Sequence, residues 1–112
     1  MRIGKVYYQD KLAGHITATD HGEYLFQYTP EYVQSSPDLF LTFSMPVRRE
    51  PYIERHLFPF FEGLIPEGWL LEMAIQKWNL KRNDSMGLLL ACCQNCIGAV
   101  SIHPLIQEEN EL

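Results

Sequence analysis

Three cysteines near the end of the chain have the spacing that most readily suggests chemistry. Cys93 and Cys96 form a Cys-x-x-Cys pair directly after Cys92. Such a pair can supply half of a tetrahedral zinc site, and His103 is the one nearby candidate for a further ligand. The pair could instead cycle between dithiol and disulfide. We expect neither, and predict reduced, mostly buried thiols and no metal site.

Other arrangements of catalytic residues are missing from the sequence. None of the seven glycines lies in a GxxxxGK or GxGxxG phosphate-binding loop, and the His-Arg-Asp and Asp-Phe-Gly segments of protein kinases are absent. No serine has the G-x-S-x-G setting of a nucleophile elbow. The four histidines (His15, His21, His56 and His103) are too scattered to support a metal cluster or a triad. We therefore predict no catalytic residues, no cofactor and no enzymatic activity.

The best candidate for a functional surface is an apolar stretch over residues 57–78. It holds more large apolar side chains than one helix stripe can bury, which favours two short helices meeting at a corner near Pro66 and Gly68. Trp69 follows the corner, and Trp78 lies nine residues later, on the opposite side of the second helix. Both rings could lie in the core, but one faces outward more easily. Because tryptophan is a common interface anchor, we predict a partner-binding patch of Glu67, Gly68, Trp69, Leu70 and Met73.

Length, composition and charge narrow the class of protein. The 112 residues suffice for one domain, and 46% of them are hydrophobic. A formal net charge of -5 argues against direct binding to nucleic acid, which needs clustered Lys and Arg. No window is apolar enough to span a membrane and the start does not resemble a signal peptide, so we expect a cytoplasmic protein. We expect one domain over residues 1–106 and an acidic, flexible tail over residues 107–112.

The pattern of apolar residues predicts the secondary structure. Short β-branched and aromatic runs predict strands over residues 3–8, 13–17, 23–28, 39–45 and 97–102. In the fourth run, alternation predicts that Leu39, Leu41, Phe43 and Met45 share one face.

Capping signals predict the helices. We expect a single helical turn after Pro30, a helix from near His56 or Leu57 that Gly63 ends in the left-handed conformation, a second from about Glu67 to Trp78, and a third, capped by Asn83 or Asp84, through Ala91. Strands, then helices, then a last strand indicate an α+β domain with a small, mostly antiparallel sheet and three short helices on one face.

Several segments resemble the amino-terminal subdomain of HipA-type serine/threonine kinases, the toxins of bacterial toxin–antitoxin systems. Residues 60–68, FFEGLIPEG, are similar to the family's FFDNLLP(E/D)G, and residues 39–46 resemble its PLSLSLP. Leu88 and Leu89 followed by IGAV at residues 97–100 are similar to a third family segment. The resemblance covers nearly all residues from Val6 to Pro104, although Cys93 and Asn95 stand where the family usually has Gly and Asp.

The resemblance implies a role as a binding partner. In full-length family members a kinase core follows this subdomain, whereas this chain ends at Leu112. It is thus similar to HipS, the small antitoxin of systems that also contain a kinase, HipT, and a DNA-binding protein, HipB. The resemblance implies that the chain neutralises a HipT-like serine/threonine kinase, whose substrate is an aminoacyl-tRNA synthetase, in a complex with a HipB-like protein. Two alternatives are a non-inhibitory subunit that completes the kinase fold or bridges it to the repressor, and a fragment of a full-length kinase.

Overall fold

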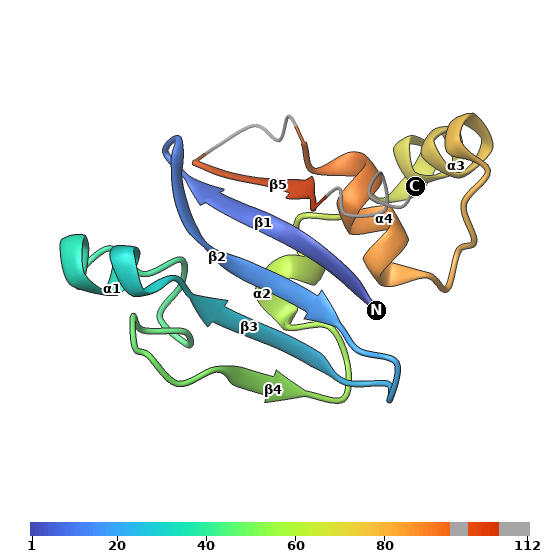
Figure 1. Cartoon of the computed structure of the whole chain (residues 1–112). Coiled ribbons are helices and arrows are strands. Elements are labelled where there is room, and N and C mark those ends of the chain that lie inside the picture. Colours follow the sequence, from blue (N-terminus) through green and yellow to red (C-terminus); the bar gives the residue numbers. More distant parts are fainter. Residues whose placement is uncertain (95–98, 106–112) are drawn as a thin grey trace.

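The fold is a single antiparallel sheet with helices packed on one face. The computed structural model describes residues 1–94 and 99–105. Five strands form the sheet in the order β4-β3-β2-β1-β5, and every neighbouring pair is antiparallel. This arrangement confirms the predicted α+β class. The elements, shown in Figure 1, are β1 (Arg2–Tyr8), β2 (Lys11–Ala18), β3 (Tyr24–Tyr28), α1 (Pro30–Ser35), β4 (Tyr52–Glu54), α2 (Pro59–Glu62), α3 (Gly68–Trp78), α4 (Ser85–Cys92) and β5 (Val100–Pro104).

The core lies between one face of the sheet and the helices α2 and α4. Alternate side chains of the strands point to this face, and Val6, Ile16, Phe26 and Ile102 are fully buried there. Phe61 of α2 closes the core from the helical side, with its ring centroid 5.5 Å from that of Phe26. Met86, Leu88 and Leu89 of α4 are also buried. Among the described residues, no helix is long and apolar enough to cross a membrane.

The fourth predicted strand, over residues 39–45, is wrong: the segment is an irregular loop. The Tyr28 hydroxyl accepts a hydrogen bond from the Leu41 amide at 3.1 Å and donates one to the Met45 carbonyl at 2.5 Å. The Tyr32 hydroxyl donates to the Leu39 carbonyl at 2.6 Å. The tyrosine hydroxyls therefore hydrogen-bond to backbone groups of the loop that would otherwise need partners on a neighbouring strand. Because these groups are satisfied, the loop does not have to pair within the sheet.

The fourth strand of the sheet lies instead at Tyr52–Glu54. It is three residues long and pairs only with β3, so it forms one edge of the sheet. The Tyr52 hydroxyl donates to the Pro46 carbonyl at 2.6 Å, which fixes the chain leading into this strand. The predicted last strand begins at Val100 in the described part of the chain, and residues 97 and 98 lie outside it, as does the predicted tail over residues 107–112.

The helix boundaries follow their capping residues closely. Helix α2 begins at Pro59 rather than at His56 or Leu57, with proline in the first turn as expected. The prediction that Gly63 is left-handed is wrong, since its φ is −66°. Asp84 caps α4, and its carboxylate accepts from the Gly87 amide at 3.1 Å. The single helical turn expected after Pro30 is a short helix, α1, which adds to the three predicted helices.

Candidate partner-binding surface

Helix α3 lies outside the main core and packs against α4 by one narrow side. Figure 1 shows it beside α4, on the far side from the sheet. Helical spacing places Leu71, Ala74, Ile75 and Trp78 on this packed side. Ala74 is the one buried residue of α3, and Leu71 and Ile75 are half-buried. The contact is therefore narrow and leaves most of the helix surface to solvent.

The opposite side of α3 is apolar and exposed. Trp69 is 70% exposed, Leu70 52% and Met73 57%. Trp69 and Met73 are four residues apart, so their side chains are neighbours on the helix surface. These three residues are called the α3 patch below. A surface helix normally has one apolar side, and a helix that is apolar on two sides is normally covered on both.

A left-handed glycine sets the direction in which Trp69 points. Gly68, the first residue of α3, has a φ of +64°, and a Cβ built there would meet no atom within 4 Å. The requirement for glycine is therefore conformational and not a matter of space. Glu67 precedes it in extended geometry and makes no side-chain capping bond to the helix. The five residues predicted from the sequence thus lie together at one exposed helix start, and their role in binding remains a prediction.

Charged side chains border the α3 patch. Arg82, in the connection to α4, forms an ion pair with Glu72 at 2.7 Å. Lys77 lies over the Trp78 ring, with its Nζ 5.1 Å from the ring centroid. Because both members of the ion pair are largely exposed, it adds little to stability, but it holds the helix relative to the following loop. An apolar centre with a charged border is the usual anatomy of a protein–protein interface.

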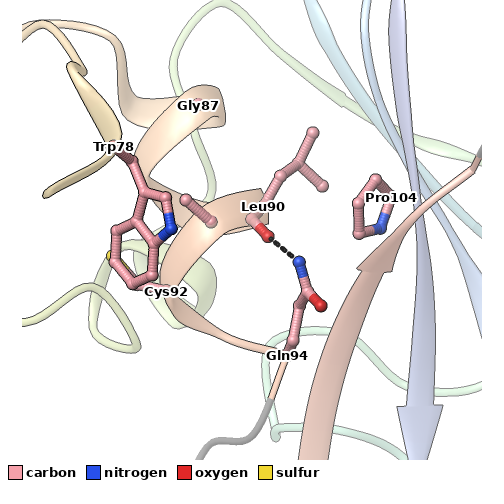
Figure 2. A pocket seen from close by; sticks show the side chains of 7 residues that line it. Trp78, Gly87, Leu90, Cys92, Gln94 and Pro104 are labelled. Carbon is pink, nitrogen blue, oxygen red and sulfur yellow. Dashed lines mark hydrogen bonds between the residues drawn. The ribbon is translucent and has the colours of Figure 1, made fainter. Parts of the chain in front are cut away.

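Trp78 occupies a different setting from Trp69. It is 46% exposed and forms one wall of an open hollow of about 610 Å³ between α3, α4 and β5. Figure 2 shows Trp78 on one side, Pro104 on the other and Leu90 between them. The Gln94 side-chain amide donates to the Leu90 carbonyl at 3.2 Å. The two tryptophans thus lie on opposite sides of α3 as the spacing predicted, and neither is a core residue.

The cysteine segment shows one buried thiol. Cys93 is fully buried, and its Sγ donates to the Leu64 carbonyl at 3.3 Å. Cys92 is half-buried, and Cys96 lies outside the described residues. In residues 1–94 and 99–105, no three His, Cys, Asp or Glu side chains are close enough to hold a metal ion. His103, the suggested fourth ligand, contacts the Tyr7 ring instead, with 5.4 Å between ring centroids.

The sequence reasoning missed an exposed aromatic residue outside α3. Phe43 is 89% exposed in the loop between α1 and β4, and its ring contacts that of Phe40 at a centroid distance of 5.2 Å. The loop is held by the tyrosine hydroxyls described above, and burial raises the pKa of Tyr28 to about 12. The Ser-Ser-Pro-Asp segment before this loop and the proline after it are turn signals that could have indicated an irregular segment.

Comparisons with known proteins agree with this fold and its motifs. Residues 4–103 match the family model described as HipA N-terminal domain. An uncharacterized protein of Haemophilus influenzae is 34% identical over 111 residues, which is 99% of this chain and 96% of that protein. The putative kinase Y4mE of Sinorhizobium fredii is 29% identical over 111 residues, and this chain spans only 26% of its length. A solved structure titled N-terminal domain of HipA toxin matches with a TM-score of 0.70 and 28% identity, covering 96% of this chain and 95% of that one.

Proposed function

This chain belongs to the HipA N-terminal domain family, and from that premise we propose that it is an antitoxin-type binding protein that associates with a separate HipT-like serine/threonine kinase and neutralises it. The observation that carries the proposal is the α3 patch. Trp69, Leu70 and Met73 are exposed on a helix whose other side already packs against α4. Covering this patch with a second protein would remove a large apolar area from water.

The proposed mechanism is steric. Trp69 lies in the first turn of a helix whose direction is set by Gly68, so the indole is presented on a fixed backbone. We place this ring against the nucleotide cleft of the kinase. Kinases work mainly by positioning phosphate groups, metal ions and loops, so a ring that holds those loops apart is enough to stop phosphoryl transfer. The inhibitor itself needs no catalytic group, which agrees with the absence of catalytic motifs from the sequence.

Co-expression with a HipT-like kinase from the same genome tests the proposal in bacteria. Wild-type chain should relieve growth arrest, and Trp69→Ala should fail to do so while remaining folded. Phe43→Ala is the matched control, because it also removes an exposed aromatic ring. Phe43 belongs to the connection between α1 and β4, two elements that lie at the other side of the domain from α3 in Figure 1. If Trp69→Ala neutralises the kinase as well as the wild-type chain does, the proposed mechanism is wrong.

A second candidate function is that of a non-inhibitory subunit that completes the kinase fold or bridges it to a HipB-like DNA-binding repressor. The exposure of Phe43, away from α3, favours this candidate because a bridge needs two surfaces. Autophosphorylation of the kinase separates the two functions. An inhibitor lowers the rate of autophosphorylation when it binds, whereas a bridging subunit leaves this rate unchanged. If the chain is a bridging subunit, Phe43→Ala should lose binding to the repressor but keep binding to the kinase.

A further inference from the structure

The two edges of the sheet differ in how their outward backbone groups are used. β5 forms one edge and β4 the other. At the β5 edge the Ile102 amide donates to the Cys93 carbonyl at 2.8 Å, and Pro104 has no amide hydrogen to offer. A neighbouring element that covers the edge and a proline within it both protect an edge strand from further pairing. The β5 edge is therefore closed at these positions.

The hydrogen-bonding pattern shows which backbone groups of β4 face outward. The Thr29 amide donates to the Ala13 carbonyl at 2.9 Å, at the end of the unbroken register between β2 and β3. Neighbouring residues of a strand direct their backbone groups to opposite sides, so the even-numbered residues of β3 bond to β4. Ile53 lies opposite an odd-numbered residue, Leu25. The N–H and C=O of Ile53 therefore point away from the sheet.

These two groups of Ile53 have no hydrogen-bond partner in the part of the chain that the structure describes. Figure 1 shows β4 at the lower margin of the sheet, with no helix or strand beyond it. The edge is short, since Pro51 has no N–H and its carbonyl accepts from the Arg48 guanidinium at 3.2 Å. The Ile53 side chain is 53% exposed. The open edge thus consists of one donor and one acceptor beside an exposed apolar side chain.

We propose that the β4 edge pairs antiparallel with the β4 edge of a second copy of this chain, with a two-fold axis between the two Ile53 residues. Two residues that face each other across antiparallel strands can exchange both backbone hydrogen bonds. A residue that faces its own copy across a two-fold axis meets this condition by symmetry, because each copy supplies one donor and one acceptor. The pair joins two five-stranded sheets edge to edge and brings the two Ile53 side chains together.

Charges beside the axis are complementary in the same register. With Ile53 opposite its copy, Tyr52 lies opposite Glu54 of the second copy. The Arg48 guanidinium lies over the Tyr52 ring, 3.8 Å from its centroid. Among the described residues Arg48 has no carboxylate partner and donates only to backbone carbonyls, and the Glu54 carboxylate reaches only the exposed His56, at 4.0 Å. The symmetry gives two Arg–Glu contacts, and these favour a second copy over an unrelated strand.

This pairing leaves the α3 patch exposed. Figure 1 places β4 and α3 at different sides of the domain. The proposal therefore does not depend on the function proposed for the α3 patch.

Sedimentation velocity of the full chain between about 10 µM and about 1 mM tests the proposal, because a dimer held by only about 4 kcal/mol is half formed near 1 mM. We expect a reversible equilibrium between monomer and dimer. Ile53→Pro removes the outward N–H without removing a hydrogen bond to β3, so it should raise the Kd of the dimer about thirtyfold, the effect of two lost bonds. Ile53→Val is the matched control. It keeps the N–H and should change the Kd no more than about threefold.

Charge reversal tests the register without a proline. Glu54→Arg and Arg48→Glu each bring like charges together in both contacts, so each variant alone should lose the dimer over the same concentration range. An equimolar mixture of the two should recover it, because both contacts are again between Arg and Glu. Circular dichroism checks that each variant is folded, and if Ile53→Pro is not, the mixture decides.

Three results would overturn the proposal. They are a wild-type chain that stays monomeric at about 1 mM, an Ile53→Pro chain that associates as the wild type does, and a mixture that associates no better than either charge variant alone. Trp69→Ala should form the dimer normally. Loss of the dimer in Trp69→Ala would assign the association to the α3 patch and would also overturn the proposal, so its failure and that of the kinase proposal are distinguishable.

Discussion

The two tryptophans of α3 allow binding to be separated from folding by one pair of variants. Trp69 is 70% exposed and belongs to the α3 patch, whereas Trp78 is 46% exposed and lies on the packed side of α3, across the hollow from Pro104 of β5. We predict that Trp69→Ala strongly weakens kinase binding and leaves the domain stable. Trp78→Ala should do the reverse, since its ring contributes to the attachment of the helix.

The expected losses in the free energy of unfolding follow from the buried area of each ring. Trp69 buries about 75 Å² of a surface of roughly 250 Å², which is worth about 2 kcal/mol at most, and the higher helix propensity of alanine reduces the net loss to about 1 kcal/mol. Trp78 buries about 135 Å², and the same reasoning gives a loss of about 2.5 kcal/mol.

The loss of affinity for the kinase should be larger for Trp69→Ala than for Trp78→Ala. A tryptophan at the centre of an interface typically contributes about 2–4 kcal/mol, so Trp69→Ala should raise the Kd for the kinase about 30- to 700-fold. Urea unfolding of each variant and calorimetric titration of the folded variants into the purified kinase measure both quantities. The reasoning is refuted if Trp69→Ala destabilises the domain more than Trp78→Ala, or if it binds the kinase with wild-type affinity.

Three other predictions test the remaining structural claims. Gly68→Ala should cost about 1–2 kcal/mol in urea unfolding because of its left-handed backbone, whereas Gly63→Ala, in a right-handed helical conformation, should change stability by less than about 0.5 kcal/mol. The hydrogen bond from Arg2 lowers the pKa of Asp84, so this carboxylate stabilises the fold above the ordinary carboxyl pKa and loses that effect as the pH falls through its folded value. Asp84→Asn, which keeps a capping oxygen, should therefore flatten the fall in unfolding free energy below about pH 4. Tyr28→Phe leaves two backbone groups without their partner and should cost about 2–4 kcal/mol, and it should also remove the loss of stability that the wild type shows as the pH rises from about 10 toward the raised pKa of about 12.

The strands that could be predicted are those whose alternation matches burial. In β3, Tyr24, Phe26 and Tyr28 alternate with Leu25 and Gln27, and the structure puts the aromatic residues on the core side. Side chains of a strand alternate between its two faces, so burial of one face produces the period of two residues seen in the sequence.

The segment over residues 39–45 has similar alternation but a different cause. Leu41 and Met45 are buried, and their backbone groups hydrogen-bond to the Tyr28 hydroxyl of β3, while the Tyr32 hydroxyl of α1 bonds to the Leu39 carbonyl. Phe43 is turned to solvent. Those tyrosines are between seven and seventeen residues away in sequence, and no local pattern encodes the contact. β4 could not be predicted for a related reason: its three residues form a strand only because they pair with β3.

The sequence predicted on which sides of α3 the two tryptophans lie, but not how exposed Trp78 is. The nine-residue spacing of Trp69 and Trp78 already places the rings on opposite sides of a helix. The half-exposure of Trp78 could not be predicted, because it depends on how far α3 stands from β5 across the hollow that Figure 2 shows. That distance is set by tertiary packing and by the loop after α3.

Helix α3 is held more by its ends than by its packing. Gly68 at its start and Asn79 at its end both have left-handed backbones, with φ of +64° and 54°, and Arg82 ties its middle to the next loop through Glu72. These features fix the direction of the helix while burying only Ala74. A helix anchored in this way is oriented before a partner arrives, so little ordering of its backbone opposes binding. In the proposed complex a partner would supply the apolar cover that the domain itself does not, and the proposed binding role would then account for the exposure of the α3 patch in the isolated chain.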